Sequence, residues 1–269
     1  MICFPNAKIN LGLHITRKRE DGYHDIETVF YPIPLCDALE ITEASETTFR
    51  QTGIAIDAPA EKNLVMCALA KLKEHHPLPP LHIELRKVIP FGAGLGGGSS
   101  DAAHMLKLVN DFCHLQLSDE ELERIASSIG ADCAFFIRNA PVFATGIGNV
   151  FAPLKLSLAG WHLVLVKPDV SVPTGEAYAQ VSPHAPAVSL PEIIARPVET
   201  WKEAMTNDFE ASVLAKYPLI GQIKEKLYAQ GAVYASMSGS GSAVYGLFRE
   251  APALQDAFEG SFVWQAQLP

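Results

Sequence analysis

The sequence predicts an α+β fold, with strands and helices interspersed along the whole chain. Residues 7–15 and 81–88 alternate apolar and polar side chains, as strands with two different faces do. Residues 63–73 and 118–130 instead repeat their apolar side chains at helical spacing. From Trp161 onward a second, compact set of strand and helix patterns follows. A chain of 269 residues is long enough for one large domain or for two of ordinary size.

The composition fits a soluble protein that buries a large core, with 48% hydrophobic residues and a net charge of −9. The negative charge argues against a nucleic-acid-binding surface. Five cysteines, an odd number without metal-site spacing, predict reduced thiols in a cytosolic protein. No signal peptide opens the chain, and no apolar run approaches the roughly 18 residues of a membrane span. We therefore expect a cytoplasmic protein that binds neither nucleic acid nor membrane.

The glycine-rich segment Pro90–Ala103 stands between a predicted strand and a predicted helix, and five of its glycines fall within seven residues. Glycine permits positive φ and close approach of a ligand to the backbone. The helix start behind it offers unpaired N–H groups and the positive end of the helix dipole. Together these features predict an anion site, most often for phosphate. The alternative is a flexible linker or a tight turn with Ser99 as helix cap, but linkers rarely join a strand to a well-patterned helix.

Two common phosphate loops do not explain this segment. Gly92, Gly94 and Gly97 satisfy the dinucleotide pattern G-x-G-x-x-G, but the chain continues into a second helix where a dinucleotide fold needs a strand closed by an acidic residue. A P-loop needs a lysine where Gly98 stands. The positive charge for a phosphate must therefore come from elsewhere.

The predicted strand over residues 7–15 is half-buried and carries Lys8 and Asn10 on its polar face. An exposed lysine on a solvated sheet is the ordinary interpretation. A phosphate site that needs a cation favours a functional role for Lys8 instead.

A turn at Asp21-Gly22 leads to a strand over residues 26–31, which Pro32 and Pro34 are expected to end before residues 37–42 resume it. Tyr23 and His24 precede this strand. They are either ordinary strand residues or a pair that stacks on a base and hydrogen-bonds to it.

Asp132 lies in the sequence Gly130-Ala131-Asp132, after a helix that opens with a capping box at residues 118–121. Small residues flank this carboxylate, and an aromatic run follows it. It can serve as a helix N-cap. Alternatively it faces a site, where it could pair with a lysine and orient a substrate hydroxyl.

The second half opens with a strand over residues 163–166 and a short helix that contains Tyr178. Four prolines predict a loop over residues 181–197. Helices around residues 201–214 and 219–230 follow.

The segment 238–242, Ser-Gly-Ser-Gly-Ser, joins the predicted strands 233–237 and 243–248. It is either a hairpin turn or a second set of backbone donors that closes over an anion. A short helix over residues 252–258 and a last strand near 262–267 end the chain.

Three of these motifs resemble those of the GHMP small-molecule kinases: the strand with residues 7–11, the glycine segment 90–103 and the late segment 238–241. The elements at residues 21–24 and 130–132 narrow the resemblance to a member that phosphorylates a cytidine-diphosphate sugar alcohol. The match runs from residue 3 to about residue 248. It implies a ribosomal protein S5 domain 2-like N-terminal domain over residues 1–155 and a ferredoxin-like C-terminal domain over residues 156–269. It also implies ATP and Mg²⁺, although the sequence shows no convincing carboxylate ligand set for the metal.

The resemblance assigns roles to individual residues. Asp132 matches the catalytic aspartate, and Lys8 matches the lysine that keeps this carboxylate ionised and steadies charge in the transition state, as phosphoryl transfer requires. Tyr23 and His24 match the cytidine-reading pair, and Asn10 is expected to lie beside the polyol or the phosphates of the substrate. The ATP phosphate segment comprises Pro90, Phe91, Gly92, Ala93, Gly94, Leu95, Gly96, Gly97, Gly98, Ser99 and Ser100.

Tyr178 stands where the family often has phenylalanine, and a tyrosine can still stack on a base. Ser238, Gly239, Ser240 and Gly241 match the phosphate-closing loop. Cys133 and Ala134 replace the Val/Ile-Pro pair often found after the aspartate, which changes packing rather than chemistry.

Two other functions stay open at this point. A sister kinase for homoserine, mevalonate or a sugar would give Tyr23 and His24 no purpose. A non-catalytic nucleotide-binding module would have no use for Lys8 and Asp132 together. The oligomeric state is not indicated.

Overall fold

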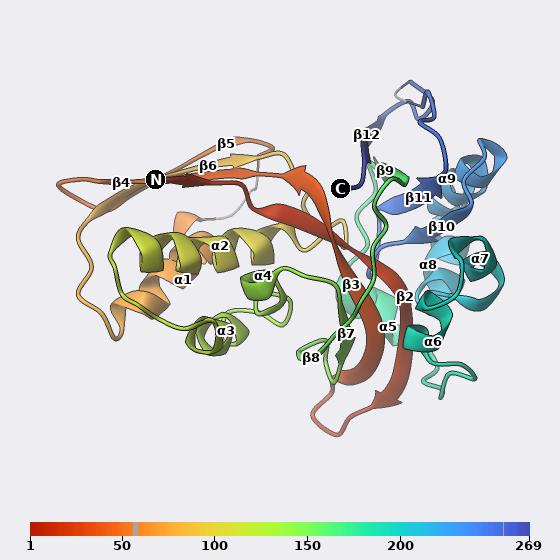
Figure 1. Ribbon diagram of the computed structural model, residues 1–269, viewed down its shortest axis with the longest axis horizontal. Coiled ribbons are helices and arrows are strands. Elements are labelled where there is room, and N and C mark those ends of the chain that lie inside the picture. The colour runs from red at the N-terminus through yellow and green to blue at the C-terminus, as the bar shows by residue number, and fades with distance from the viewer. Residues whose placement is uncertain (56–58, 255) are drawn as a thin grey trace. The chain divides into compact units, whose positions relative to one another are not determined.

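The computed structural model describes residues 1–55, 59–254 and 256–269 (Figure 1). Over these residues the chain packs as two compact units, each assembled from separate stretches. Unit 1 comprises Met1–Lys8, Leu35–Phe91 and Gly96–Ala140, and unit 2 comprises Ile9–Pro34, Gly92–Leu95 and Pro141–Pro269. The glycine segment therefore contributes to both units. A division into two continuous domains near residue 155 stays a prediction.

Unit 1 is a four-stranded sheet with helices on one face (Figure 1). The strand order is β1-β4-β6-β5; β5 and β6 are parallel, and the other pairs are antiparallel. The strands are β1 (Ile2–Cys3), β4 (Ala38–Glu43), β5 (Thr48–Gly53) and β6 (Leu81–Lys87). The helices are η1 (Ala60–Lys62), α1 (Leu64–Lys73), α2 (Gly97–Phe112), α3 (Asp119–Ser127) and α4 (Phe135–Arg138).

Local sequence signals set the helix starts in unit 1. The Asn63 side chain accepts a hydrogen bond from the Val65 N–H at 3.0 Å and caps α1. Ser118 and Glu121 form the expected capping box of α3. The predictions for residues 63–73, 81–88 and 118–130 are therefore confirmed.

Unit 2 holds most of one four-stranded sheet, in the order β2-β3-β7-β8, and all of a second, in the order β10-β11-β9-β12. The strands are β2 (Asn6–Lys18), β3 (His24–Cys36), β7 (Val142–Thr145), β8 (Val150–Pro153), β9 (His162–Pro168), β10 (Tyr234–Met237), β11 (Val244–Phe248) and β12 (Ser261–Gln267). The helices are α5 (Thr174–Ala179), α6 (Leu190–Ile194), η2 (Val198–Thr200), α7 (Trp201–Ala204), α8 (Glu210–Lys216) and α9 (Pro218–Ala229).

An apolar core holds unit 2 together. Leu13 and Ile15 of β2 join side chains of the second sheet and of α8 and α9 in one buried cluster, which includes Val164, Ile220 and Leu227. Because this part of β2 also carries Asn10, the packing fixes the stretch of strand on which one predicted site residue lies. Among the described residues, no helix combines the length and the apolar character needed to cross a bilayer.

Two expectations about the first strands were wrong. β2 is buried on both faces rather than half-buried, and its polar residues Lys8 and Asn10 lie inside. β3 continues through Pro32 and Pro34 to Cys36. Both prolines lie outside the ladder with β7, which pairs only with Thr28–Phe30.

In the second half, the helix expected over residues 201–214 is interrupted at Met205–Phe209. There the Leu13 N–H donates to the Thr206 carbonyl at 2.9 Å, and the Asn207 side chain donates to the carbonyls of Met237 and Gly239 at 2.9 and 2.8 Å. These tertiary hydrogen bonds replace helical ones.

The loop expected over residues 181–197 contains α6, whose Pro191 occupies a first-turn position where proline is favourable. Residues 252–254 and 256–258 form no helix, contrary to expectation, and residue 255 lies outside the described residues.

Candidate functional site

Lys8 and Asp132 form an ion pair in unit 1. Lys8 Nζ lies 3.5 Å from Asp132 Oδ2. The lysine side chain is 4% exposed and the aspartate side chain 33% exposed, so the ammonium is enclosed while the carboxylate remains reachable. The N-cap interpretation of Asp132 was wrong, because α4 begins after Ala134 without a side-chain cap. The pair can present a negatively charged acceptor whose charge is balanced from the protein side.

The start of α2 packs against Lys8 and against the residue that follows Asp132. Gly96, at φ +69°, precedes the helix, and a Cβ there would lie 3.2 Å from Lys8 Cε and 3.0 Å from the Phe136 ring. The Ser99 hydroxyl hydrogen-bonds to the thiol of Cys133, the residue after Asp132, and burial raises the pKa of that thiol to about 11. Lysine, helix start and aspartate are therefore contiguous.

The first turn of α2 supplies backbone donors at this place. The helix begins at Gly97, so Ser99 lies in its first turn rather than at its cap. The N–H groups of the first residues of a helix have no partner within it and carry the positive end of its dipole. Gly97, Gly98 and Ser99 can therefore hold an anion beside a lysine and a carboxylate.

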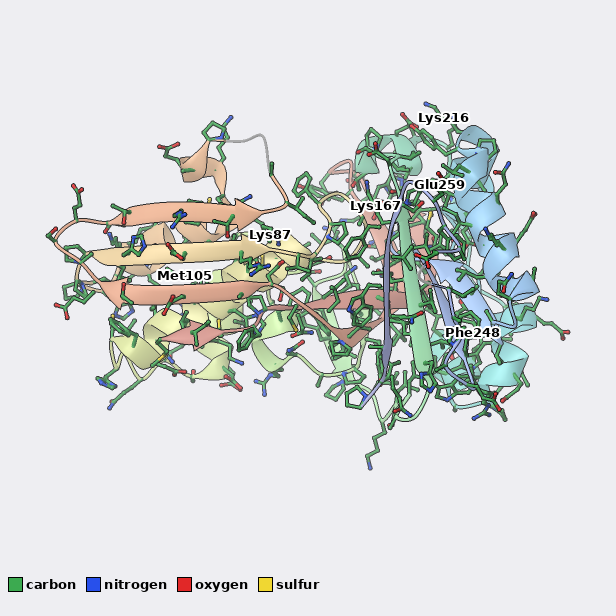
Figure 2. The ribbon with its side chains drawn as sticks, turned by 90° about the horizontal axis from the view of Figure 1, so that it is seen from above. Lys87, Met105, Lys167, Lys216, Phe248 and Glu259 are labelled. Carbon is green, nitrogen blue, oxygen red and sulfur yellow. The ribbon has the colours of Figure 1, made fainter. Side chains whose placement is uncertain are left out.

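A buried ionic network, which the sequence reasoning missed, lies behind the same helix start. Lys87 Nζ donates to Asp37 and, at 2.7 Å, to Asp101 Oδ2. Asp37 Oδ1 also accepts from the N–H groups of Val88 and Ile89 at 2.5 and 2.9 Å. Burial raises the pKa of Asp101 to about 7. Figure 2 shows Lys87 at the end of β6.

The alternation of β6 was an available signal for this network. Leu81, Ile83, Leu85 and Lys87 share one face, and that face is buried. A lysine in register with three core residues needs buried partners, and Asp101 stands within the glycine-segment motif itself.

In unit 2 the loop at residues 238–241 packs directly on the glycine segment. The Ser238 hydroxyl donates to the Gly94 carbonyl at 2.9 Å, and the Asn10 N–H donates to the Ser238 hydroxyl at 3.3 Å. A Cβ at Gly94 would lie 1.9 Å from the Ser238 carbonyl oxygen. Two of the three motifs and Asn10 therefore meet in one unit, and a mere hairpin turn does not account for these contacts.

Further hydrogen bonds fix Asn10. Its side-chain amide donates to the Thr28 hydroxyl at 2.9 Å, and that hydroxyl donates to the Gly12 carbonyl at 2.6 Å. The Tyr245 hydroxyl donates to the Asn10 carbonyl at 2.7 Å. Asn10 is therefore held by β3 and β11 together.

His24 and Tyr178 stack in unit 2, with ring centroids 4.9 Å apart and planes inclined by 24°. The Tyr178 ring also meets Phe209 edge-on at 4.8 Å. The structure thus brings together two of the three aromatic residues predicted to read the base. Tyr23 is 62% exposed at the hairpin tip, and Phe91 is 68% exposed. A role for these two rings stays a prediction.

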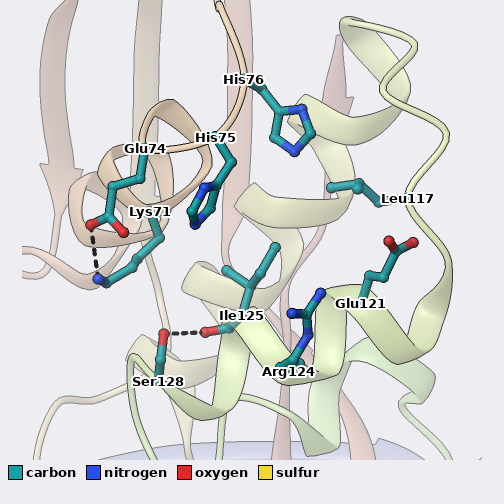
Figure 3. Close-up of a pocket in the computed structure, with 9 residues that line it drawn as sticks. All are labelled: Lys71, Glu74, His75, His76, Leu117, Glu121, Arg124, Ile125 and Ser128. Atoms are coloured by element: carbon teal, nitrogen blue, oxygen red, sulfur yellow. Dashed lines mark hydrogen bonds and ion pairs between the residues drawn. The ribbon is translucent and has the colours of Figure 1, made fainter.

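A hollow of about 380 Å³ lies elsewhere in unit 1, between the end of α1 and α3 (Figure 3). Its charged lining is partly paired, with Lys71 to Glu74 at 2.8 Å and Glu121 engaged in the α3 capping box. None of the nine lining residues is a predicted site residue.

For metal binding, the described residues bring three or more histidine, cysteine or carboxylate side chains together only at His14, His184 and Asp208. That cluster includes neither Asp132 nor the glycine segment. The structure therefore assigns no protein ligand set for the expected Mg²⁺. All five cysteines carry free thiols.

Comparison with known proteins places the chain among its relatives. The sequence model described as GHMP kinases N terminal domain matches residues 63–140, and the one described as GHMP kinases C terminal matches residues 189–263. A 4-diphosphocytidyl-2-C-methyl-D-erythritol kinase of Parabacteroides distasonis is 62% identical over 270 residues, and one of Bacteroides fragilis is 57% identical over 273 residues. Each match covers 100% of both chains.

Solved structures agree. A crystal structure of 4-(cytidine 5'-diphospho)-2C-methyl-D-erythritol kinase matches with a TM-score of 0.85 at 30% identity, covering 98% of each chain. A homoserine kinase from Cytophaga hutchinsonii matches with a TM-score of 0.69 at 19% identity and shares the fold. The predicted two-domain α+β fold is confirmed. The chain therefore belongs to the 4-diphosphocytidyl-2-C-methyl-D-erythritol kinases, within the GHMP kinase superfamily.

Proposed function

We propose that this protein transfers the γ-phosphoryl group of ATP to the 2-hydroxyl of 4-diphosphocytidyl-2-C-methyl-D-erythritol, a step of the non-mevalonate route to isoprenoid precursors. One observation carries the chemistry: the Lys8–Asp132 ion pair lies at the start of α2, where backbone donors are available for phosphate. The relatives that match this chain over their full length are named 4-diphosphocytidyl-2-C-methyl-D-erythritol kinases.

Asp132 acts on the attacking hydroxyl in this mechanism. Its partly exposed carboxylate orients the hydroxyl or accepts its proton, while Lys8 balances the charge and steadies the transferring group. The phosphates lie along residues 90–100, with the N–H groups of Gly97, Gly98 and Ser99 as donors. Phosphoryl transfer depends mostly on such positioning and electrostatic stabilisation.

His24 and Tyr178 select the acceptor, since a pyrimidine can extend the stack that their rings form. Tyr23 contributes a further ring, and Asn10 binds the polyol or phosphates. Ser238–Gly241 closes over the bound phosphates.

Mg²⁺ enters with ATP, because this ion binds through substrate phosphates and only one or two carboxylates. The described residues offer no larger ligand set near Asp132. We place the reaction in the cytoplasm, in accordance with the absence of disulfides among the five cysteines.

The test is ADP release by the purified protein with Mg-ATP and each of four acceptors: the cytidyl compound, homoserine, mevalonate and galactose. Turnover with the cytidyl compound alone supports the proposal. Turnover with another acceptor would keep the Lys8–Asp132 chemistry and remove the base-recognition role of His24 and Tyr178. ATP binding without turnover on any acceptor would indicate a nucleotide-binding module instead.

A further inference from the structure

We propose that His14, His184 and Asp208 form a binding site for a divalent transition-metal ion, with Zn²⁺ as its occupant. The three residues come from β2, from the segment before α6 and from the segment before α8. Each offers one ligand atom, and these atoms lie within 4.8 Å of one another. The kinase reaction assigns no role to this cluster.

The two histidines approach different oxygens of Asp208, at distances that two ligands of one metal ion can also have. His14 Nδ1 lies 3.4 Å from Asp208 Oδ1, and His184 Nδ1 lies 3.6 Å from Asp208 Oδ2. A strong N–H···O hydrogen bond is shorter, about 2.7–3.2 Å. Two ligands of a tetrahedral Zn²⁺, each about 2.0–2.1 Å from the ion, lie roughly 3.3 Å apart. Each nitrogen therefore stands from its Asp208 oxygen at about the spacing of two ligands on one ion, and the three ligand atoms lie within 4.8 Å of one another.

Backbone hydrogen bonds hold the three ligands in place without a metal. Asp208 N–H donates to the Leu13 carbonyl and His184 N–H to the Ile15 carbonyl, both at 2.9 Å. The Ile15 N–H donates to Asp208 Oδ2 at 2.7 Å and fixes the carboxylate. Such support of a ligating carboxylate is typical of metal sites.

The His14 ring is enclosed at the cluster, since its side chain is 5% exposed. The nitrogen that faces Asp208 is Nδ1, at 3.4 Å from Oδ1, so Nδ1 is the atom that would ligate the ion.

The charge also favours a cation. The Asp208 side chain is only 9% exposed, and within the described part of the chain its ion-pair partners are the two histidines alone. When these rings are neutral, no lysine or arginine of that part forms an ion pair with this carboxylate. Two imidazoles and one carboxylate suit Zn²⁺, whereas Mg²⁺ and Ca²⁺ prefer oxygen ligands. The 53% exposed His184 provides access from solvent.

The test is zinc binding by the untagged, metal-stripped full chain, measured by titration calorimetry and by metal content after dialysis. We expect one Zn²⁺ per chain. His184→Gln should lower the affinity at least about tenfold, by removal of a direct ligand. The side chain is exposed, so this variant should fold normally. His75→Gln removes an exposed histidine outside the cluster and should bind Zn²⁺ as the parent does.

Thermal unfolding gives a second readout. Zn²⁺ should raise the unfolding midpoint of the parent chain and of His75→Gln, but not that of His184→Gln. No stoichiometric binding by the parent would overturn the proposal and leave the cluster as a buried ion pair. Equal affinity in His184→Gln and the parent would also overturn it, because the ion would then occupy another place, such as the thiols.

Discussion

The buried ammonium of Lys8 lies 3.5 Å from the partly exposed carboxylate of Asp132. This spacing balances the charge of the carboxylate without a short hydrogen bond that would occupy it. The carboxylate is 33% exposed, so in the proposed mechanism it can take the substrate hydroxyl while Lys8 balances its charge. The pair has the arrangement expected of a proton acceptor and its counter-charge.

Asp132→Asn tests directly whether the Asp132 carboxylate accepts the proton of the substrate hydroxyl. The amide keeps the size of the side chain but cannot accept a proton, so kcat should fall by roughly 10²–10⁴ while the Kd of ATP changes little. Steady-state kinetics and ATP titration measure the two effects. Asp111→Asn, which changes an exposed carboxylate on α2, is the control and should leave both values unchanged. Near-normal turnover of Asp132→Asn would remove this residue from the mechanism.

Gly96→Ala tests the packing of the glycine segment against Lys8. The new Cβ would meet the Phe136 ring at 3.0 Å and Lys8 Cε at 3.2 Å, at a φ of +69° that alanine disfavours. We expect a clear loss of kcat/KM for ATP and a lower unfolding midpoint. Gly92→Ala is the matched control, because its φ is also positive, at +61°, but its Cβ would meet only Ser171 Oγ at 3.8 Å. Equal effects of the two changes would contradict a special role for Gly96.

The sequence predicted the local parts of this site well, because their signals are contained in adjacent residues. The glycines mark the loop before α2, and the capping box that opens with Ser118 marks the start of α3. Alternation located β2 and β6. None of these signals depends on what packs above them.

The rest depended on tertiary contacts. Burial of the polar face of β2 could not be inferred from alternation, which cannot tell a solvated face from one covered by protein. The break at Met205–Phe209 arises because Leu13 and Asn207 make hydrogen bonds with distant segments. Apolar spacing in residues 201–214 contains no trace of those partners.

Gly94→Ala tests the contact between the glycine segment and the loop 238–241. Its Cβ would lie 1.9 Å from the Ser238 carbonyl oxygen, so the loop would have to move. Gly92→Ala is the matched control: its φ is also positive, at +61°, but its Cβ would meet only Ser171 Oγ at 3.8 Å. Both variants carry similar backbone strain, so a difference between their KM values for ATP reports the contact with the loop 238–241. We expect the KM of ATP to rise more in Gly94→Ala, and indistinguishable KM values would argue against a role for the loop in phosphate binding.

His24→Ala tests recognition of the acceptor. Loss of the ring removes a stacking partner of Tyr178 and a hydrogen-bonding group, so the KM of the cytidyl substrate should rise by about tenfold or more. The KM of ATP should stay within about twofold. His75→Ala, which removes an exposed histidine ring far from these residues in the sequence, is the control and should leave both values nearly unchanged. A parallel rise of the two KM values in His24→Ala would indicate a structural role rather than base recognition.

Asp101→Asn tests the buried network behind α2 through its pH dependence. Burial raises the pKa of Asp101 from 3.8 to about 7. Between these values the unfolded chain has lost the proton while the folded chain retains it, so the free energy of unfolding contributed by this group falls as pH rises and becomes level above the folded pKa. Asparagine cannot ionise and removes this slope.

The unfolding free energy of Asp101→Asn, measured in urea, should therefore improve relative to the parent chain as pH rises from about 4 to about 7, by at most roughly 4 kcal/mol. The exposed carboxylate of Asp111 provides the control, because Asp111→Asn should track the parent across this range. A constant difference between Asp101→Asn and the parent would show that Asp101 is already ionised in the fold, with Lys87 balancing both carboxylates. A rising difference would show that α2 begins over a network in which one carboxyl group still holds its proton.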